Sequence, residues 1–226
     1  FKTMGFNIAI DGPAGAGKST IAKKAAADLG FIYVDTGAMY RALALYFIRN
    51  GIDGADEEAI KNALTQISVT LQYSGGTQQV LLNGENVSDL IRTEEVSRMT
   101  SVTSALGCVR EKLLSLQQDM AAAHDVIMDG RDIGTNVLPN ADIKIYLTAS
   151  VAERARRRYL EQKQKGGTSS LEEIEKDIIE RDTRDKNRAI APLRRAEDAV
   201  YLDTSDMNID EVAAEIERLY REKIRS

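Results

Sequence analysis

The sequence predicts an α/β protein: a five-stranded parallel sheet flanked by helices, with an inserted subdomain that contains an antiparallel hairpin. Three observations support this fold. Short β-branched apolar runs alternate with longer helical patterns. The runs are continuously apolar, as is typical of parallel strands buried on both faces. One stretch between the second and third runs has a two-residue alternation instead. A chain of 226 residues is long enough for one such domain and its insert.

The elements follow from these patterns in order along the chain. We expect strands at residues 7–11, 31–35, 125–129, 143–147 and 199–203. We expect helices at residues 18–29, 38–50, 57–66, 94–123, 151–165, 171–187 and 209–223. Ser150 with Glu153, and Ser170 with Glu173, have the spacing of capping boxes at two helix starts.

The insert is expected at residues 53–104. Val69, Leu71 and Tyr73 alternate with polar residues, and a Gly-Gly turn precedes a second short strand at 79–82. This pattern is typical of a hairpin with one solvated face. Residues 1–52 and 105–226 then form the core domain, and the Gly-Gly pair within residues 155–170 indicates the tip of a short lid.

Composition narrows the possible partners. The net charge of −5 argues against a general nucleic-acid binder, so an anionic substrate must meet local basic clusters. The single cysteine, Cys108, cannot form an internal disulfide. The chain shows neither a signal-peptide pattern nor an apolar run of membrane-spanning length. We therefore expect a cytoplasmic protein with no membrane partner, and a monomer since no interface signature stands out.

A glycine-rich segment directly after the first strand fits the pattern G-x-x-x-x-G-K-[ST]. Its glycines allow successive backbone N–H groups to point at one phosphate, and the following helix presents its positive end to the same anion. A glycine-rich turn without a ligand is the alternative. The residues expected to bind ATP are Gly12, Pro13, Ala14, Gly15, Ala16, Gly17, Lys18, Ser19 and Thr20.

Two residues are expected to hold Mg²⁺. The Ser19 hydroxyl is the direct ligand of the loop pattern, and Asp129 at the end of the third strand suits a contact through water. Asp129 could instead be an ordinary strand-end turn residue. The sequence lacks the N-K-x-D motif with which GTPases read guanine, so a small-molecule kinase fits best.

Four motifs in order extend this reading along nearly the whole chain. They are D-G-P-x-G-A-G-K from Asp11, D-T-G-A-M-Y-R from Asp35, D-G-R-D-I-G-T from Asp129 and R-D-x-R-D-x-N-R-A-x-A-P-L from Arg181. Together with the hairpin insert, they resemble the bacterial cytidylate kinases. The resemblance implies transfer of a phosphoryl group from ATP, with Mg²⁺, to CMP or dCMP. It also implies a nucleoside monophosphate kinase fold with an enlarged monophosphate-binding insert and a short lid.

The resemblance also implies roles for matching residues. Arg41 and Arg131 would bind the acceptor phosphate, and Asp132, Ser101 and Arg110 would read the pyrimidine. Arg181 and Asp185 would bind the sugar, and Arg188 the nucleotide. The family commonly has Ser or Thr at the position of Thr36, so this residue is expected to contact CMP as well. The residues expected to bind CMP are Thr36, Arg41, Ser101, Arg110, Arg131, Asp132, Arg181, Asp185 and Arg188.

Cytosine chemistry agrees with these roles. A carboxylate can accept from the 4-amino group of cytosine, while Arg and Ser donate to N3 and O2. Uracil reverses the first two of these, because it has an oxygen at position 4 and an N–H at position 3. The acceptor phosphate is already ionised near neutral pH, so no general base is needed. The only histidine, His124, is expected at an ordinary surface position.

The basic helix at residues 151–165 has two readings. Arg154, Arg157 and Arg158 share one helical face next to the Gly-Gly pair, which suggests a lid that closes over ATP. They could equally form a solvated face paired with Glu153 and Glu161. We expect Lys18, Arg41, Arg131 and Arg157 to be the catalytic residues.

Two alternative functions remain. Another P-loop small-molecule kinase, of the shikimate, gluconate or dephospho-coenzyme A class, should lack the hairpin and the motif at Arg181. A nucleotide-sensing module would bind ATP without phosphoryl transfer.

Overall fold

The computed structural model describes residues 5–226. The chain divides into two compact units, and the division falls within one strand. One unit comprises residues 34–124 together with Gly5, and the other comprises residues 6–33 and 125–226. The first unit thus includes a helix on either side of the expected insert, so the boundaries 53–104 remain a prediction of the sequence.

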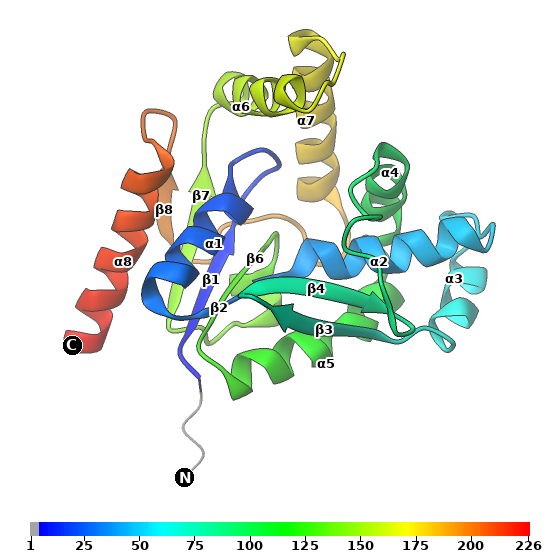
Figure 1. The fold of residues 1–226 in the computed structure, drawn as a ribbon, viewed down its shortest axis with the longest axis horizontal. Helices are drawn as coiled ribbons and strands as arrows, with labels where there is room; N and C mark the ends of the chain where they lie inside the picture. The colour runs from blue at the N-terminus through cyan, green and yellow to red at the C-terminus, as the bar shows by residue number, and fades with distance from the viewer. Residues whose placement is uncertain (1–4) are drawn as a thin grey trace. The chain divides into compact units, whose positions relative to one another are not determined.

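The predicted five-stranded sheet is present (Figure 1). Its strand order is β2-β6-β1-β7-β8, so the chain crosses over between neighbours. β1 pairs in parallel with β6 and with β7, and β7 pairs in parallel with β8. The strands are β1 (Asn7–Asp11), β2 (Ile32–Asp35), β6 (Val126–Gly130), β7 (Ile143–Thr148) and β8 (Val200–Asp203). Each agrees with a predicted strand to within one residue at either end.

Two helices cover one face of this sheet, α1 (Lys18–Leu29) and α8 (Ile209–Arg225). Their apolar stripes meet the sheet in one buried cluster that includes Ile21 of α1, Ile216 of α8 and Ile10 of β1. α1 ends where Gly30 adopts a positive φ of 73°, which a glycine reaches without strain. The apolar core of this unit therefore lies between β1 and the two helices, next to the loop that joins β1 to α1.

Helices α6 (Val151–Gln164) and α7 (Leu171–Asn187) pack against each other through a small cluster that contains Ala155, Ile174 and Ile178 (Figure 1). α7 begins with the predicted capping box of Ser170 and Glu173. The second predicted box is only half correct. Ser150 accepts from the Glu153 amide, but the Glu153 carboxylate pairs with arginines instead of returning to the cap.

The other unit contains the predicted hairpin, β3 (Val69–Ser74) and β4 (Thr77–Leu82), with a short third strand β5 (Glu85–Asn86) that the pattern did not predict. Its helices are α2 (Thr36–Arg49), α3 (Glu57–Leu64), α4 (Glu94–Thr103) and α5 (Gly107–Ala123). Phe47, Ile60 and Leu113 are among its fully buried side chains.

The prediction of a single helix over residues 94–123 is wrong, because the chain forms α4 and α5 with a break between them. Leu106 adopts an extended conformation at the break. The Ser104 carbonyl oxygen, at the end of α4, accepts from the Arg110 guanidinium at 2.9 Å. A side-chain donor thus replaces a main-chain donor, which periodicity does not reveal.

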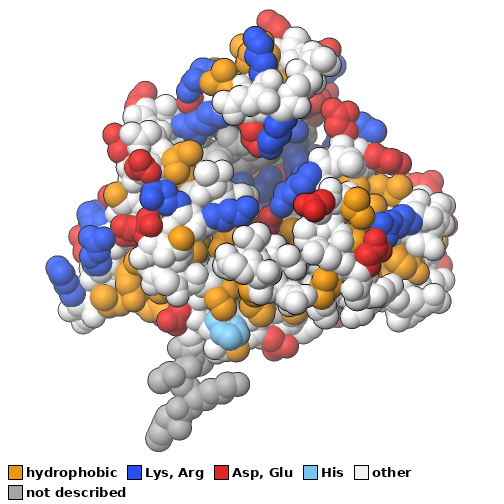
Figure 2. Space-filling model, viewed as in Figure 1, with side chains coloured by type: hydrophobic (Ala, Val, Ile, Leu, Met, Phe, Trp, Pro, Cys, Tyr) orange, Lys and Arg blue, Asp and Glu red, His pale blue; other side chains and the backbone are white. Residues whose placement is uncertain are grey.

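On the face drawn in Figure 2, lysine and arginine side chains are interspersed with aspartate and glutamate. An anionic substrate therefore has to be met by particular basic residues, as the net charge suggests. Within residues 5–226, every helix is too short or too polar to be a candidate membrane span. His124 is exposed, as expected.

Candidate functional site

The glycine-rich loop joins the carboxyl end of β1 to the start of α1. Gly15 and Gly17 have φ values of 74° and 79°, so both occupy the left-handed region. A side chain at Gly12 would place its Cβ 1.9 Å from the Leu147 carbonyl oxygen, so only glycine allows the loop to pass β7. α1 has neither a side-chain cap nor an acidic residue in its first turn. Its amino end is therefore suited to bind an anion.

Lys18 is the first residue of α1, and its side chain folds back onto the loop. Its Nζ donates to the Pro13 carbonyl oxygen at 2.9 Å, and the residue is 6% exposed. Burial, reinforced by the positive charge of Arg131, lowers the pKa of Lys18 to about 7, although Asp129 acts to raise it. A phosphate would supply the negative charge that this buried ammonium needs.

Asp129 is brought beside the loop by the sheet register, which pairs it with Ile10 of β1. Its Oδ2 accepts from the Ser19 hydroxyl at 3.3 Å, and its Oδ1 accepts from the Tyr33 hydroxyl at 3.0 Å. A hydroxyl and a buried carboxylate are hard oxygen donors of the kind that Mg²⁺ prefers. Among residues 5–226, no group of three or more His, Cys, Asp or Glu side chains is placed to hold a metal. The donor set therefore fits a Mg²⁺ ion that takes its remaining ligands from water and phosphate.

Three arginines surround one carboxylate in the same unit. Arg131 donates through Nε to Oδ2 of Asp185 at 3.0 Å, while Arg181 and Arg188 approach the same carboxylate at 3.9 and 4.0 Å. Burial acts to raise the pKa of Asp185, but the three guanidiniums hold it below its usual range. One negative charge among three positive charges leaves a cationic cluster, which favours an anionic ligand.

Asp132 follows Arg131 directly and is 4% exposed. Its Oδ2 accepts from the side-chain Nδ2 of Asn136 at 3.2 Å, and Asn136 lies within the short π-helical segment η1 (Ile133–Val137). Such segments are rare and often lie at functional sites. The structure thus places the carboxylate expected to read cytosine on a distinct local conformation that the sequence did not predict.

The remaining predicted residues belong to the unit formed by residues 34–124. Arg41 donates to the Ile91 carbonyl oxygen at 3.1 Å and to the Ser97 hydroxyl at 2.8 Å. Arg110 is buried, with its guanidinium 5.2 Å from the centre of the Tyr40 ring. Ser101 is also buried. Buried polar side chains such as these favour a ligand with matching polar groups over an apolar ligand.

Thr36 is buried at the first turn of α2, where Asp35 is fixed from three directions. The Asp35 side chain caps α2 at the Ala38 amide and pairs with Arg92 at 2.6 Å. The Gln78 side chain bonds both the main-chain N–H and the main-chain oxygen of Asp35. Gln78 lies on β4, so the hairpin holds the start of α2, a function that its alternating pattern alone did not indicate.

Comparison with known proteins identifies the family. The family model described as cytidylate kinase matches residues 8–222. A cytidylate kinase from Lactobacillus johnsonii is 51% identical over 216 residues, which cover 96% of this chain and 94% of that one. A cytidylate kinase from Shouchella clausii is 50% identical over 221 residues, which cover 98% of each. The chain belongs to the cytidylate kinase family.

Structural similarity adds only a likeness of fold. The crystal structure of an uncharacterized protein from Eubacterium ventriosum matches with a TM-score of 0.50 at 10% identity. The match covers 95% of this chain and 97% of that chain. The core fold of this cytidylate kinase family member is therefore shared with a protein of almost unrelated sequence.

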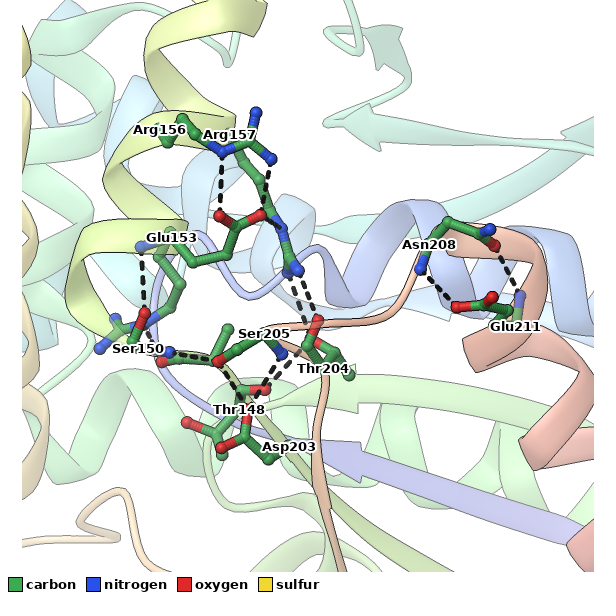
Figure 3. Close-up of polar contacts among 12 residues, drawn as sticks. Thr148, Ser150, Glu153, Arg156, Arg157, Asp203, Thr204, Ser205, Asn208 and Glu211 are labelled. Carbon is green, nitrogen blue, oxygen red and sulfur yellow. Dashed lines mark hydrogen bonds and ion pairs between the residues drawn. The ribbon is translucent and has the colours of Figure 1, made fainter.

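The arginines of α6 bind different partners in this family member. Arg157 donates to Glu153 and reaches the end of β8, where it bonds the Thr204 hydroxyl at 3.2 Å and the Thr204 main-chain oxygen at 2.6 Å (Figure 3). Pairing with Arg156 and then Arg157 lowers the pKa of Glu153 to about 2. Arg157 is thus held beside the strand ends rather than extended into solvent.

Arg154 lies on the same helix but points into the protein. It is 4% exposed and bonds three partners: the Ala149 and Ala14 main-chain oxygens and the Asp182 carboxylate. Ala14 belongs to the phosphate-binding loop and Asp182 to α7. Arg154 therefore ties the loop to the pair α6 and α7, whereas the sequence pattern placed it among the lid arginines.

Proposed function

We propose that this protein transfers the γ-phosphoryl group of ATP to CMP or dCMP, giving ADP and CDP or dCDP. Membership of the cytidylate kinase family supports this activity. The observation that carries it is the cluster of three arginines around the single carboxylate of Asp185, in the same unit as the phosphate-binding loop. Lys18 of the phosphate-binding loop is close enough to Arg131 and Arg181 for their charge to lower its pKa.

The phosphate-binding loop would hold the triphosphate. The main-chain amides around Gly15 and Gly17 and the amino end of α1 would bind the phosphate oxygens. Lys18 would release its bond to the Pro13 carbonyl and donate to the outer phosphates. The whole run of residues 12–20 is thereby assigned to ATP.

Ser19 and Asp129 would hold Mg²⁺, the serine directly and the aspartate through water. Their oxygens already lie within 3.3 Å of each other, so the donors are gathered in advance. The ion would neutralise charge on the β- and γ-phosphates. Tyr33 keeps the second oxygen of Asp129 occupied and so directs Oδ2 toward Ser19.

Arg41 and Arg131 would bind the acceptor phosphate, while Arg181 and Asp185 would bind the sugar. Arg188, which is 6% exposed at its side chain, would add a third positive charge toward the nucleotide. The acceptor oxygen is ionised near neutral pH, so the protein has to align it and neutralise charge rather than remove a proton. Thr36 is assigned to the same substrate.

Asp132, Ser101 and Arg110 would distinguish cytosine from uracil. Asp132 would accept from the 4-amino group, and the other two would donate to the ring acceptors. Uracil would place an oxygen against the carboxylate. Because each unpaired buried polar group costs about 1–3 kcal/mol, the mismatch would disfavour UMP by about 2–6 kcal/mol.

Arg157 would assist closure over ATP from α6, and its present partner Thr204 would be exchanged for nucleotide. We propose that the monomer is the acting unit, which gel filtration with light scattering can test.

The test is an ADP-release assay with Mg²⁺ and ATP over CMP, dCMP, UMP, AMP and GMP. We expect strong turnover with CMP, or with CMP and dCMP, and none comparable with the purines. ATP binding without turnover on any acceptor would contradict the proposal.

The same assay with Asp132→Ala tests the cytosine contact. We expect the preference for CMP over UMP to fall at least tenfold, because the carboxylate that selects the amino group is gone. Asp142 is an exposed carboxylate at the amino end of β1, so Asp142→Asn should leave the preference unchanged. An unchanged preference in Asp132→Ala would show that cytosine is read elsewhere.

A further inference from the structure

Asp11 is a buried carboxylate for which the proposed reaction has no role. It ends β1, directly before the phosphate-binding loop, and is 4% exposed. Its Oδ1 accepts from the Ile133 amide and its Oδ2 from the Gly134 amide, both at 2.8 Å. Two carboxylate oxygens thus bind two successive main-chain N–H groups, which requires both oxygens to act as acceptors.

The two amides belong to the first turn of η1. Asp132 occupies the cap position of this segment but makes no side-chain cap bond there. Asp11 supplies that bond from a neighbouring strand, so it satisfies N–H groups that would otherwise lack an acceptor.

Position 134 leaves little room for a side chain between Lys144 and the carboxylate. A Cβ there would lie 3.1 Å from Cδ of Lys144 and 3.4 Å from Oδ2 of Asp11. The first distance is tighter than an ordinary contact, so either the Lys144 side chain or the Gly134 backbone would have to shift by a few tenths of an ångström.

The residues immediately before η1 are the two assigned to the acceptor. Arg131 donates to Asp185 at 3.0 Å, and Asp132 is assigned to cytosine. The backbone between β6 and η1 sets the directions of the Arg131 and Asp132 side chains. Asp11 binds this backbone where η1 begins. We propose that Asp11 is a positioning residue for the monophosphate, whose ionised carboxylate clamps Ile133 and Gly134 and so directs Arg131 and Asp132. This inference rests on the proposed function.

The protonation state of Asp11 controls the clamp. Burial raises its pKa to about 6, although the Gly134 and Ile133 amides act to lower it. Asp132 raises this pKa further, and Lys18 lowers it. A protonated carboxyl turns one acceptor into a donor, so one of the two amides would lose its partner.

Two groups on β7 also face this region. Tyr146 lies near enough for the Asp11 charge to act in raising the pKa of its phenol, whose main cause is burial. Lys144 packs its alkyl chain at Gly134, while its ammonium bonds the Pro139 carbonyl oxygen and Asp198. The positive charge of Lys144 is therefore engaged elsewhere, and the clamp should loosen as the pH falls through about 6.

The first test measures nucleotide binding by calorimetry at pH 7.5. In Asp11→Asn one acceptor becomes an NH₂ group that faces an N–H donor. We expect Kd for CMP to rise at least tenfold, while Kd for ATP changes less than threefold. Asp142→Asn is the matched control, because it also removes a carboxylate that accepts from a main-chain amide, that of Asn7 at the other end of β1. It should change neither value.

Gly134→Ala provides a second variant in case Asp11→Asn folds poorly. It keeps the carboxylate but crowds the contact between Gly134 and Asp11, so we again expect weaker CMP binding with ATP binding retained. A CMP affinity equal to that of the wild type in both variants would overturn the inference. If the wild type itself leaves CMP unphosphorylated, the proposed function fails instead, so the two failures are distinguishable.

The pH profile provides a readout that a purely structural carboxylate would not move. CMP has its own ionisation near pH 6. With Asp11 as a second group, log(kcat/KM) for CMP should fall below pH 6 with a slope approaching 2 in the wild type. The slope should approach 1 in Asp11→Asn, and 2 in Asp142→Asn. Equal slopes in the wild type and Asp11→Asn would contradict the proposal.

Discussion

The Nη1 atom of Arg154 lies 2.7 Å from Oδ2 of Asp182, and the same nitrogen donates to the Ala14 main-chain oxygen. Both side chains of this pair are less than a tenth exposed. The other oxygen of Asp182 has no hydrogen-bond partner within residues 5–226. The stability of the pair therefore depends on one close contact and on the loop carbonyl that shares it.

Removing either partner should destabilise the protein strongly. Arg154→Met leaves the Asp182 charge buried without compensation, and Asp182→Asn does the same to Arg154. We expect each single variant to lower the free energy of unfolding by about 3–5 kcal/mol, measured by urea denaturation. The double variant should lose less than the sum of the two, because no charge is left unpaired.

Lys165→Met serves as the control for this pair. Lys165 forms an exposed ion pair with Glu161 at the end of the same helix, so its loss should cost at most about 1 kcal/mol. Additive losses in the double variant would show that Arg154 and Asp182 act independently.

Tyr33→Phe should weaken the use of Mg²⁺. The phenol holds Oδ1 of Asp129 at 3.0 Å, so its removal frees the carboxylate to rotate away from Ser19. A hydrogen bond to a charged group contributes about 1.5–3 kcal/mol, part of which a water can replace. We expect the Mg²⁺ concentration for half-maximal activity to rise about threefold to tenfold, with kcat at saturating Mg²⁺ nearly unchanged.

Tyr159→Phe is the matched control, since the Tyr159 hydroxyl accepts from Lys163 on the surface of α6, away from Asp129. The shift in melting temperature produced by Mg²⁺ and ATP together should be reduced in Tyr33→Phe but not in Tyr159→Phe. An unaltered Mg²⁺ requirement in Tyr33→Phe would mean that packing alone orients Asp129.

Local chemistry explains why much of the fold could be predicted from the sequence. The strands, the glycine-rich loop and α7 depend on neighbouring residues, so the bounds of α1 and α7 agree with their predicted ranges. Asp129 was predictable for the same reason: a strand that ends in aspartate places it at the edge where ligands bind.

The rest depends on contacts between distant segments. Tyr33 precedes Asp129 by 96 positions, and no periodicity connects them. Arg154 and Arg157 lie on one helix, yet one is buried against a loop and the other reaches Thr204. Tertiary packing determines which partner a charged side chain binds. The sequence alone therefore could not distinguish a lid from a solvated face for the arginines of α6.

Arg157 should contribute to catalysis rather than to stability. We expect Arg157→Met to lower kcat at saturating ATP and CMP at least tenfold, because a positive charge near the transferring group is lost. Its bonds to Thr204 are partly exposed, so the free energy of unfolding should fall by only about 1 kcal/mol.

Arg156→Met is the comparison for this variant. Arg156 is more than half exposed and pairs with the same Glu153, but it makes no bond to Thr204 in the structure. Its kcat should stay within twofold of the wild type. A large loss of stability in Arg157→Met with kcat retained would assign Arg157 to fixing α6 on β8 instead.

Asp11 should make stability depend on pH in a direction opposite to that of a paired surface carboxylate. Its pKa is raised from 3.8 to about 6 in the native state by burial. Between these two values the folded protein retains a proton that the unfolded chain has lost. The contribution of Asp11 to stability is therefore fully present below pH 3.8 and is lost as the pH rises through 6.

Asp11→Asn removes this titration, so its stability relative to the wild type should improve as the pH rises. Since one pKa unit corresponds to about 1.4 kcal/mol, the difference in unfolding free energy should shift by about 1–1.5 kcal/mol between pH 5 and pH 7.5. Urea denaturation at a series of pH values measures it, with Asp142→Asn as the exposed control. A shift of the opposite sign would mean that Asp11 is stabilised as an anion, and that its two amide bonds outweigh its burial.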